Sequence, residues 1–259
     1  MDRYGLIVEN DAHTMKILFD THTHSVASGH AYSTIDDLAR GARRRGLKGF
    51  VLTDHGPALG CYTHPYHFGN LRILPRRIEG VRFFKGIEAN ILDTEGTIDL
   101  GANQLVRLDF VLAGLHEVCA PPSDIATNTR AIVAALANPF VDAISHPGNP
   151  AFPVDARAIV SAAVEYGKAL EINDSSFRVR TGSGDTCLSI ARICAELGAL
   201  VVCGSDAHYW RDVGRFGTAV KLMRQAGVDG KQVVNASAKR FEAFMERRSA
   251  ERRAAAGIA

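Results

Sequence analysis

Seven short segments of this sequence are almost continuously apolar, and this repetition is the feature that most restricts how the chain can fold. They are KILFD (16–20), LKGFVLTD (47–54), VRFFKGIEA (81–89), DFVLAG (109–114), VDAISH (141–146), KALEIN (168–173) and ALVVCGSD (199–206). Such runs are typical of strands in a parallel sheet that is covered on both faces. Stretches with helical periodicity lie between most of them, so we expect an α/β fold in which strands and helices alternate.

The connections between these segments also carry recognisable patterns. Helices are expected at 33–45, 123–137, 155–166, 186–197 and, last in the chain, 237–248. Ser33 and Asp36 form the S-x-x-D pattern of a capped helix start. Residues 55–80 predict a loop followed by one short helix, residues 90–100 predict a β-hairpin, and residues 252–259 predict a frayed tail.

Length, charge and cysteine content narrow the class of protein. A chain of 259 residues with 46% hydrophobic residues can bury one large core, so we expect a single domain over 1–259. The net charge of +2 argues against nucleic acid or a membrane surface as the main partner, and the basic groups at 42–46 and 246–253 are expected to be solvated helix-end cations. Five scattered cysteines and no membrane-length apolar run predict a soluble cytoplasmic protein. No pattern specifies a homo-oligomer, although barrels of this size often form one.

A polar residue stands at the carboxyl end of every predicted strand. In chain order these residues are Asp20, His22, His24, Asp54, His55, Glu88, His116, His146, Asn173, Asp206 and His208. Because the carboxyl ends of strands in a β/α barrel meet at one rim, we expect these side chains to converge. Strand alternation points His22 and His24 to the same side, and Asp20 is expected there too, either binding metal or orienting a histidine.

This combination of side chains predicts a metal site. A lone histidine at a strand end is more often a hydrogen-bonded surface residue, but the convergence of many favours ligation, because buried polar groups need partners. Imidazoles and carboxylates without thiolates suit zinc, manganese or iron. Nine candidates are present: His22, His24, His30, His55, Glu88, His116, His146, Asp206 and His208. They predict two or three ions with Glu88 as a bridge, whereas His13 stands outside the set and is expected to be solvated.

Seven motifs in order give the sequence a family resemblance. The motifs DTHTHS, LTDHG, GIEAN, AGLHE, ISHPGNP, EINDSSF and GSDAH resemble the PHP (polymerase and histidinol phosphatase) family, closest to its YcdX-type bacterial phosphatases, over residues 17–245. The resemblance implies a distorted seven-stranded (β/α)7 barrel, TIM-like, with three metal ions, usually zinc and sometimes manganese or iron. It implies these ligand groups: His22, His24, Glu88 and Asp206 for one ion, Glu88, His116 and His146 for a second, and His30, His55 and His208 for a third.

The ligand set and the resemblance together imply a phosphatase that hydrolyses phosphomonoesters of small metabolites. A metal-activated hydroxide, held by Glu88, Asp206, His22 and His24, would attack the phosphorus. No G-x-S-x-G nucleophile motif is present, and Cys203 in its apolar strand is expected to be a core residue.

Substrate contacts are expected from two segments of the rim. The loop after the second strand carries His64, His67 and Arg72, of which His67 and Arg72 are taken as substrate-binding. The segment after the sixth strand carries Asn173 and Arg178, which are taken in the same way.

Two other functions use similar residues. A metal-dependent amidohydrolase also begins with H-x-H and uses a late aspartate, but no lysine ends the fourth strand here and Glu88 ends the third. The other possible function is that of a noncatalytic, metal-stabilised module in a polymerase or regulatory assembly. The intact ligand set and the lack of a fused polymerase region argue against this function.

Overall fold

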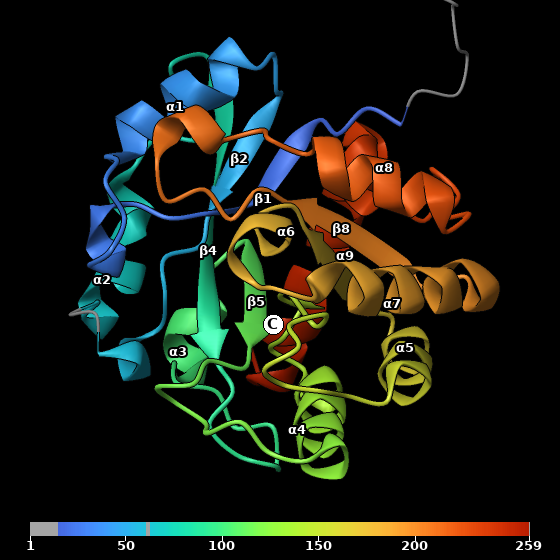
Figure 1. Cartoon of the computed structure of the whole chain (residues 1–259). Helices are drawn as coiled ribbons and strands as arrows, with labels where there is room; N and C mark the ends of the chain where they lie inside the picture. Colours follow the sequence, from blue (N-terminus) through green and yellow to red (C-terminus); the bar gives the residue numbers. More distant parts are fainter. Residues whose placement is uncertain (1–14, 61–62, 259) are drawn as a thin grey trace, which may run out of the picture.

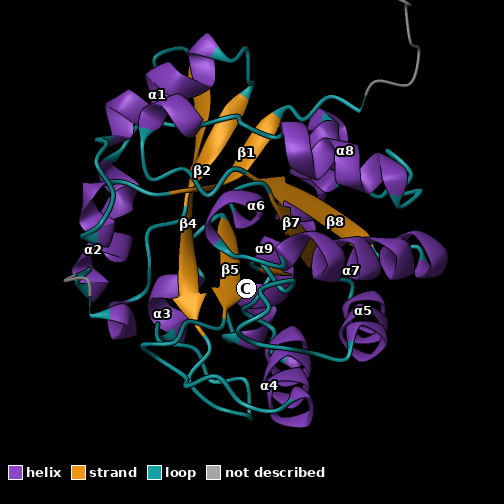
Figure 2. Cartoon of the chain, viewed as in Figure 1, coloured by secondary structure: helices purple, strands orange, loops and turns teal. Residues whose placement is uncertain are grey.

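Seven parallel strands form a nearly closed barrel in the computed structural model, which describes residues 15–60 and 63–258 (Figure 1). The strands of the barrel are β1 (Phe19–Thr23), β2 (Gly49–Leu52), β4 (Val81–Asn90), β5 (Phe110–Gly114), β6 (Ala143–Ile144), β7 (Ala169–Asn173) and β8 (Leu200–Gly204), in that spatial order. A two-residue strand, β3 (Arg77–Ile78), pairs antiparallel with β4. Figure 2 shows the strands in the centre and the helices outside them. The predicted seven-stranded (β/α)7 barrel is confirmed.

The helices follow the predicted alternation. They are α1 (Ile35–Arg44), α2 (Pro65–Asn70), α3 (Ala102–Leu105), α4 (Ile125–Ala137), α5 (Ala156–Glu165), α6 (Ser176–Val179), α7 (Ser183–Leu197), α8 (Gly217–Gln225) and α9 (Ala238–Ala255). Short 3-10 turns add η1 (Val26–Ser28), η2 (Pro57–Leu59), η3 (Leu71–Ile73), η4 (Trp210–Asp212) and η5 (Val234–Ala236). No helix among the described residues is long and apolar enough to cross a bilayer.

Local hydrogen bonds explain where some of these elements differ from the prediction. The capping box of α1 is formed by Thr34 and Asp37, one residue later than expected, because Ser33 instead accepts a hydrogen bond from the Trp210 amide. The expected hairpin at 90–100 is reduced to one antiparallel bridge between Ile91 and Ile98. Residues 55–80 hold α2 as expected, together with two 3-10 turns and β3.

The seam between the first and last strands closes the barrel through few backbone contacts. Thr23 and Ala207 form one parallel bridge. Below it, the Asn235 amide donates to the carbonyl oxygens of Phe19 and Cys203 at 2.8 Å each, and its oxygen accepts from the Cys203 amide. A single buried side chain from η5 therefore satisfies backbone groups of both edge strands.

Two apolar layers hold the barrel together. One lies between the outer face of the strands and the surrounding helices, and the other fills the inside of the barrel. Within the second, Phe241 of α9 stacks on Phe19 at 4.6 Å and meets Phe84 edge-on at 5.3 Å. Each such buried ring contributes about 1.5–3 kcal/mol relative to an exposed one. The last helix thus packs against the interior of the barrel at the end opposite the carboxyl ends of the strands.

Charged groups reinforce this end of the barrel, and here two predictions were wrong. Residues 252–255 belong to α9 and are not a frayed tail. Arg248 and Arg252, expected to be solvated, are buried and form ion pairs with the buried carboxylate of Asp142. They also donate to backbone carbonyls at the amino ends of the strands, including those of Val141 and Leu108. A frayed tail with solvated arginines was expected because helical periodicity alone does not show that an arginine has a buried carboxylate to meet.

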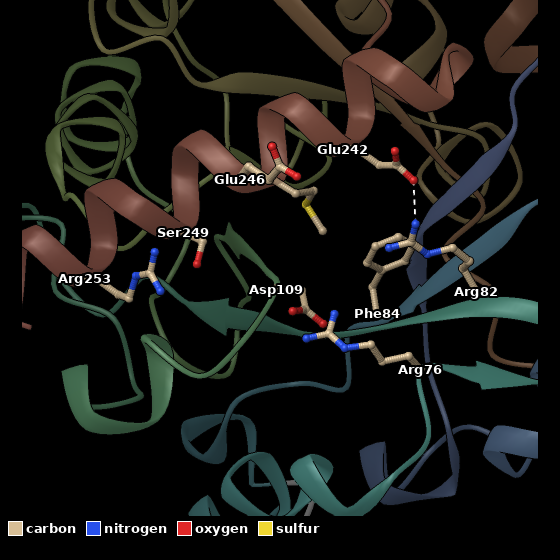
Figure 3. Close-up of a pocket in the computed structure, with 9 residues that line it drawn as sticks. Arg76, Arg82, Phe84, Asp109, Glu242, Glu246, Ser249 and Arg253 are labelled. Atoms are coloured by element: carbon tan, nitrogen blue, oxygen red, sulfur yellow. Dashed lines mark hydrogen bonds and ion pairs between the residues drawn. The ribbon is translucent and has the colours of Figure 1, made fainter. Parts of the chain in front are cut away.

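A pocket of about 370 Å³ lies beside α9 (Figure 3). Arg82 donates to Glu242 across its edge at 2.5 Å and lies over the ring of Phe84. Its lining holds three arginines (Arg76, Arg82 and Arg253) and three carboxylates (Asp109, Glu242 and Glu246), so the charges balance.

Candidate metal centre

The residues predicted as ligands meet at the carboxyl ends of the barrel strands. They reach it from β1, from β4 and from the loops after β1, β2, β5, β6 and β8. Most of these side chains are buried or nearly so, and His30 and His208 are the more exposed ones, toward the opening. A bulge in β1 between Asp20 and Thr23 allows His22 and His24 to point into the barrel.

Glu88 is the centre of this cluster. Its Oε2 lies 3.1 Å from His22 Nε2, 3.4 Å from His24 Nε2 and 3.0 Å from His55 Nδ1. Its Oε1 lies 2.8 Å from His146 Nε2 and 3.3 Å from His116 Nε2. One carboxylate therefore faces five imidazoles, with a different set on each oxygen.

Asp206 forms the second half of the cluster. Its Oδ1 lies 3.6 Å from His22 Nε2, 3.4 Å from His24 Nε2 and 3.4 Å from His208 Nδ1. His208 Nε2 in turn lies 2.8 Å from His30 Nε2. The nine predicted ligands are thus all linked into one constellation.

Hydrogen bonds to the far side of five rings orient them. His30 and His208 donate from Nδ1 to the carbonyl oxygens of Ser28 and Asp206, at 3.0 and 3.1 Å. The Ser28 hydroxyl gives its one hydrogen to Asp54, so His24 must be the donor in its 3.1 Å contact with Ser28 Oγ. In each case the proton is on Nδ1, and the Nε2 lone pair faces the cluster.

The same arrangement holds for the other two of the five rings. His22 donates from Nδ1 to Glu171 Oε1 at 2.8 Å. His116 donates from Nδ1 to Asn90 Oδ1 at 2.7 Å, and the Asn90 amide is oriented by donating to Asp99. Glu171 was not predicted as a site residue, although a carboxylate in an apolar strand, two residues before Asn173, was a signal for it.

These lone pairs need a cation between them. His22 and His24 bring their Nε2 atoms within 3.0 Å of each other, and His30 and His208 do the same at 2.8 Å. Two acceptors cannot bond to one another, but they are nearly as far apart as two ligands on one ion with metal–nitrogen bonds of about 2.0–2.1 Å. In addition, His55 Nδ1, Glu88 Oε2 and His116 Nε2 are buried and have no hydrogen-bond partner. The residues present therefore fit a metal centre.

Three overlapping groups within the cluster have the geometry of single-ion sites. In each, one ligand atom from every residue lies within 4.8 Å of the others. The groups are His24, His55 and His208; His22, His24 and Glu88; and His55, Glu88 and His116. They differ in detail from the groups implied by the family resemblance, so the assignment of ligands to individual ions stays a prediction.

The electrostatics also favour cations. Burial would raise the pKa of Glu88, but the facing imidazoles of His22, His55 and His116 hold it well below its usual range. Burial opposes a charge on His22, yet the carboxylates of Glu171, Glu88 and Asp206 raise the pKa of His22 well above its usual value. These carboxylates would stabilise a proton on His22 and, in its place, a metal ion.

Two other imidazoles are held neutral, as ligands must be. Burial, helped by the nearby His208 and His55, lowers the pKa of His24 well below its usual value. Burial and the Arg180 guanidinium lower the pKa of His146 to about 4. Both rings are ready to accept a metal ion at neutral pH.

Backbone strain and small residues make room for this cluster. His146 and Asp206 have φ of +31° and +53°, in the left-handed region that non-glycine residues seldom adopt. A Cβ on Gly204 would overlap the Glu171 carboxylate, and a Cβ on Gly114 would overlap Ser145 Oγ. The inner face of the barrel changes at this level from large apolar to polar side chains, with glycines where the polar groups need space.

The predicted substrate residues have different positions. His67 lies near the cluster, 3.0 Å from Asp54 Oδ2, and Arg72 is exposed on a groove that His67 also lines. Asn173 is 1% exposed and donates to Glu171 and Asp206, so it holds other site residues in place.

Arg178 turns away from the cluster and Arg180 turns toward it. Arg178 pairs with Asp174 at 3.1 Å, whereas both terminal nitrogens of Arg180 lie 3.3 Å from Asp206 Oδ2. Sequence reasoning did not single out Arg180, because the path of the short helix α6 decides which arginine faces inward.

Asp20 is not where the strand alternation placed it. The β1 bulge separates it from the face of His22 and His24. Its carboxylate accepts hydrogen bonds from the backbone amides of His22, Ser205 and Gly214 and from the Ser205 hydroxyl. Asp20 therefore holds the backbone at His22 and at Ser205, next to Asp206, and its role in binding metal or orienting a histidine ring stays a prediction. His13 lies outside the described residues.

Comparisons with known proteins agree with this fold. The PHP domain matches residues 20–135, and bacterial proteins are 46% to 48% identical over 90% of the chain. The chain belongs to the PHP family.

The individual relatives are named for an activity. A protein from Acetivibrio thermocellus, named a probable phosphatase, is 46% identical over 234 residues, which cover 90% of this chain and 97% of that protein. Another probable phosphatase, from Shewanella sp., is 48% identical over 235 residues, covering 90% of this chain and 93% of that one.

A solved structure shares the architecture. It is the histidinol phosphate phosphatase of Lactococcus lactis, in complex with zinc, L-histidinol and phosphate. The TM-score is 0.54 at 19% sequence identity, and the match covers 81% of this chain and 93% of that one. At this identity the likeness supports the barrel fold and not a particular substrate.

Proposed function

We propose that this protein is a metal-dependent phosphatase that hydrolyses phosphomonoesters of small metabolites at a centre of three metal ions. The observation that carries the proposal is the constellation of nine facing imidazoles and carboxylates, with unpartnered buried atoms on His55, Glu88 and His116. The names of the relatives support a phosphatase, and a zinc-bound histidinol phosphate phosphatase shares the fold. Zinc is the ion that we propose, with manganese or iron able to replace it, because the donors are nitrogen and oxygen only.

The nine residues would hold the ions, with Glu88 shared between at least two of them. His22, His24, Glu88 and Asp206 are all buried and are proposed to hold the ion nearest the reacting water. Bound divalent ions would lower the pKa of water toward neutrality and offset the negative charge on the phosphoryl oxygens.

Residues of the chain itself have two further tasks. Glu171 keeps the proton of His22 on Nδ1 and also accepts from the His146 amide at 2.8 Å, which fixes two ligands with one carboxylate. Arg180, 19% exposed and next to Asp206, is proposed to bind a phosphoryl oxygen in place of Arg178. Arg72 and His67 remain proposals for contacts farther out.

The mouth of the centre suggests how the organic part of the substrate is held. Tyr32 donates its amide hydrogen to the carbonyl oxygen of His208, and Tyr209 follows His208 directly. Their side chains are 79% and 42% exposed. Aromatic faces beside the two most open ligands would pack against the leaving group.

The two alternatives receive less support. An amidohydrolase of the kind considered above would have a lysine after the fourth barrel strand, and His116 follows β5 here. A noncatalytic module does not account for strain at His146 and Asp206 or for an arginine beside the cluster, because a stabilising ion needs neither.

The test compares hydrolysis before and after chelation. Untreated protein is analysed for metal content and assayed with p-nitrophenyl phosphate, a panel of metabolite phosphates and a panel of amides. We expect phosphate release that chelation abolishes and added metal restores. Asp206→Asn should lose it, whereas Asp212→Asn, which changes an aspartate paired with Arg215 outside the centre, should not. Chelation-sensitive amide hydrolysis alone, or phosphate release insensitive to chelation, would refute the proposal.

A further inference from the structure

A second cavity lies on the outer wall of the barrel, where α1 packs against η4. It has a volume of about 300 Å³ and is lined by Gly41, Arg44, Arg45, Trp210 and Arg211. The packing at its base is close, because a Cβ on Gly41 would overlap the carbonyl oxygen of Trp210. The two walls of the cavity are therefore held in a fixed relation to each other.

The three arginines of this cavity have no carboxylate partner. Within the described ranges 15–60 and 63–258, Arg44, Arg45 and Arg211 form no ion pair, because the nearby acids are used elsewhere. Glu79 pairs with two other arginines of α1, and Asp212 pairs with an arginine farther along the chain. Like charges gathered in this way repel one another unless an anion lies between them.

The guanidinium groups are also positioned. Those of Arg44 and Arg211 lie 5.7 Å and 5.3 Å from the centroid of the Trp210 ring. Arg45 donates to the carbonyl oxygen of Arg211 at 3.4 Å. Stacking against the indole restricts two long side chains that would otherwise be free in solvent, and it leaves their N–H edges able to bind an oxyanion.

The cavity at Trp210 and the pocket beside α9 differ in the charge of the residues that line them. The latter holds three arginines and three carboxylates, so it has no net preference for an anion (Figure 3). The cavity at Trp210 is lined by three arginines without a carboxylate. A neighbouring cavity shares Arg45 and adds Lys16, Lys221 and Arg224, again without a carboxylate, which extends the positive potential around the opening.

We propose that the cavity at Trp210 binds a phosphate-type oxyanion, separately from the metal centre. Planar guanidinium groups pair with tetrahedral oxyanions through two N–H···O bonds, which suits them better than a lone ammonium. The faces of the indole ring are already in contact with Arg44 and Arg211, so the ligand bonds to the guanidinium edges. Free phosphate and the phosphate group of a small metabolite share this chemistry.

The chain carries its own reporter, because Trp210 is its one tryptophan. Tryptophan fluorescence of the metal-containing protein is followed during titration with inorganic phosphate, sulfate and glycerol phosphate, with chloride holding the ionic strength constant. We expect a saturable change with phosphate. Arg44→Gln and Arg211→Gln should weaken the apparent affinity at least about tenfold, which corresponds to about 1.4 kcal/mol. A stronger response to glycerol phosphate than to free phosphate would identify a metabolite as the better ligand.

Arg215→Gln is the matched control, since it removes an exposed arginine that is already paired with Asp212. A phosphate-dependent rise in Tm, present in this control and lost in Arg44→Gln, gives a second readout that does not depend on the indole. All three substitutions are at exposed residues, so the folded state should be preserved.

Three outcomes would overturn the proposal. One is the absence of a saturable response in the wild-type protein. Another is an equal response in Arg44→Gln and Arg211→Gln, which would place the phosphate at the metal centre. The third is tight binding of a short single-stranded oligonucleotide without any response to phosphate, which would show that the surface binds a polyanion. None of these experiments measures phosphate release from a substrate, so this proposal and the proposed function can fail independently.

Discussion

Replacing Glu171 with Gln tests whether a change of nearly constant volume outside the proposed ligand set disturbs the metal centre. The carboxylate accepts three hydrogen bonds: from His22 Nδ1 at 2.8 Å, from the His146 amide at 2.8 Å and from Asn173 Nδ2 at 3.1 Å. A glutamine offers one oxygen and one NH2 group in nearly the same volume. At least one of the three donors must then face another donor.

The magnitude depends on which donor loses its partner. If the glutamine NH2 faces His22, that ring must move its proton to Nε2, toward Glu88, and can no longer bind metal through that atom. Loss of an outer hydrogen bond of this kind typically lowers metal affinity by about 10- to 100-fold. If the NH2 instead faces the buried His146 amide, the unpaired donor costs about 1–3 kcal/mol of stability.

The assay measures both effects. Metal affinity is determined by competition with a chromogenic chelator, and stability by urea unfolding of the metal-free and metal-loaded protein. Glu165→Gln, at an exposed position of α5, is the control and should match the wild type. A Glu171→Gln protein that keeps both its wild-type metal affinity within twofold and its wild-type stability would refute the argument that this carboxylate holds His22 and the His146 amide in place.

Three other substitutions have defined outcomes. Glu88→Gln should lower the metal content by more than one ion per chain, because the two oxygens of Glu88 face different imidazoles. Elemental analysis measures this, with Glu165→Gln again as the control. Loss of at most one ion would exclude a bridging role for Glu88. Asp142→Asn should lower the free energy of unfolding in urea by about 3–5 kcal/mol, since two buried arginines lose their counter-charge, whereas exposed Asp36→Asn should change it by less than about 0.5 kcal/mol. Burial and neighbouring arginines lower the pKa of Lys168 from 10.5 to about 7, so the unfolded chain binds more protons between these values and stability should rise with pH by up to about 1.4 kcal/mol per unit. Lys168→Met should remove this slope, and an unchanged difference between the two proteins at pH 7 and pH 9 would contradict it.

The sequence predicted the barrel and the convergence of the candidate ligands because both follow from short-range patterns. Strand segments recur with a polar residue at each carboxyl end, and the barrel brings those ends together whatever the exact register. The positions of His22, Glu88 and His146 therefore needed only the fold class. The identity of the ions, their number and the single-domain boundary stay predictions.

Residues that act through tertiary contacts were harder to place. Asp20 was placed on the wrong face of its strand because one extra residue in a strand reverses the side-chain alternation, and no local pattern marks the bulge. Glu171 and Arg180 act through partners far away in the chain, and Arg252 meets a carboxylate more than one hundred residues earlier. Periodicity reports which face of an element is apolar, but it does not report which distant group a buried charge will meet.

The position of the cluster across the barrel seam has a consequence for biosynthesis. His22 and His24 emerge early from the ribosome, whereas Asp206 and His208 are translated almost two hundred residues later. Until the last strand docks beside the first, the nascent chain can offer an ion only part of its coordination shell. Loading of the complete proposed centre would therefore follow closure of the barrel, and metal occupancy would show that the C-terminal segment has docked.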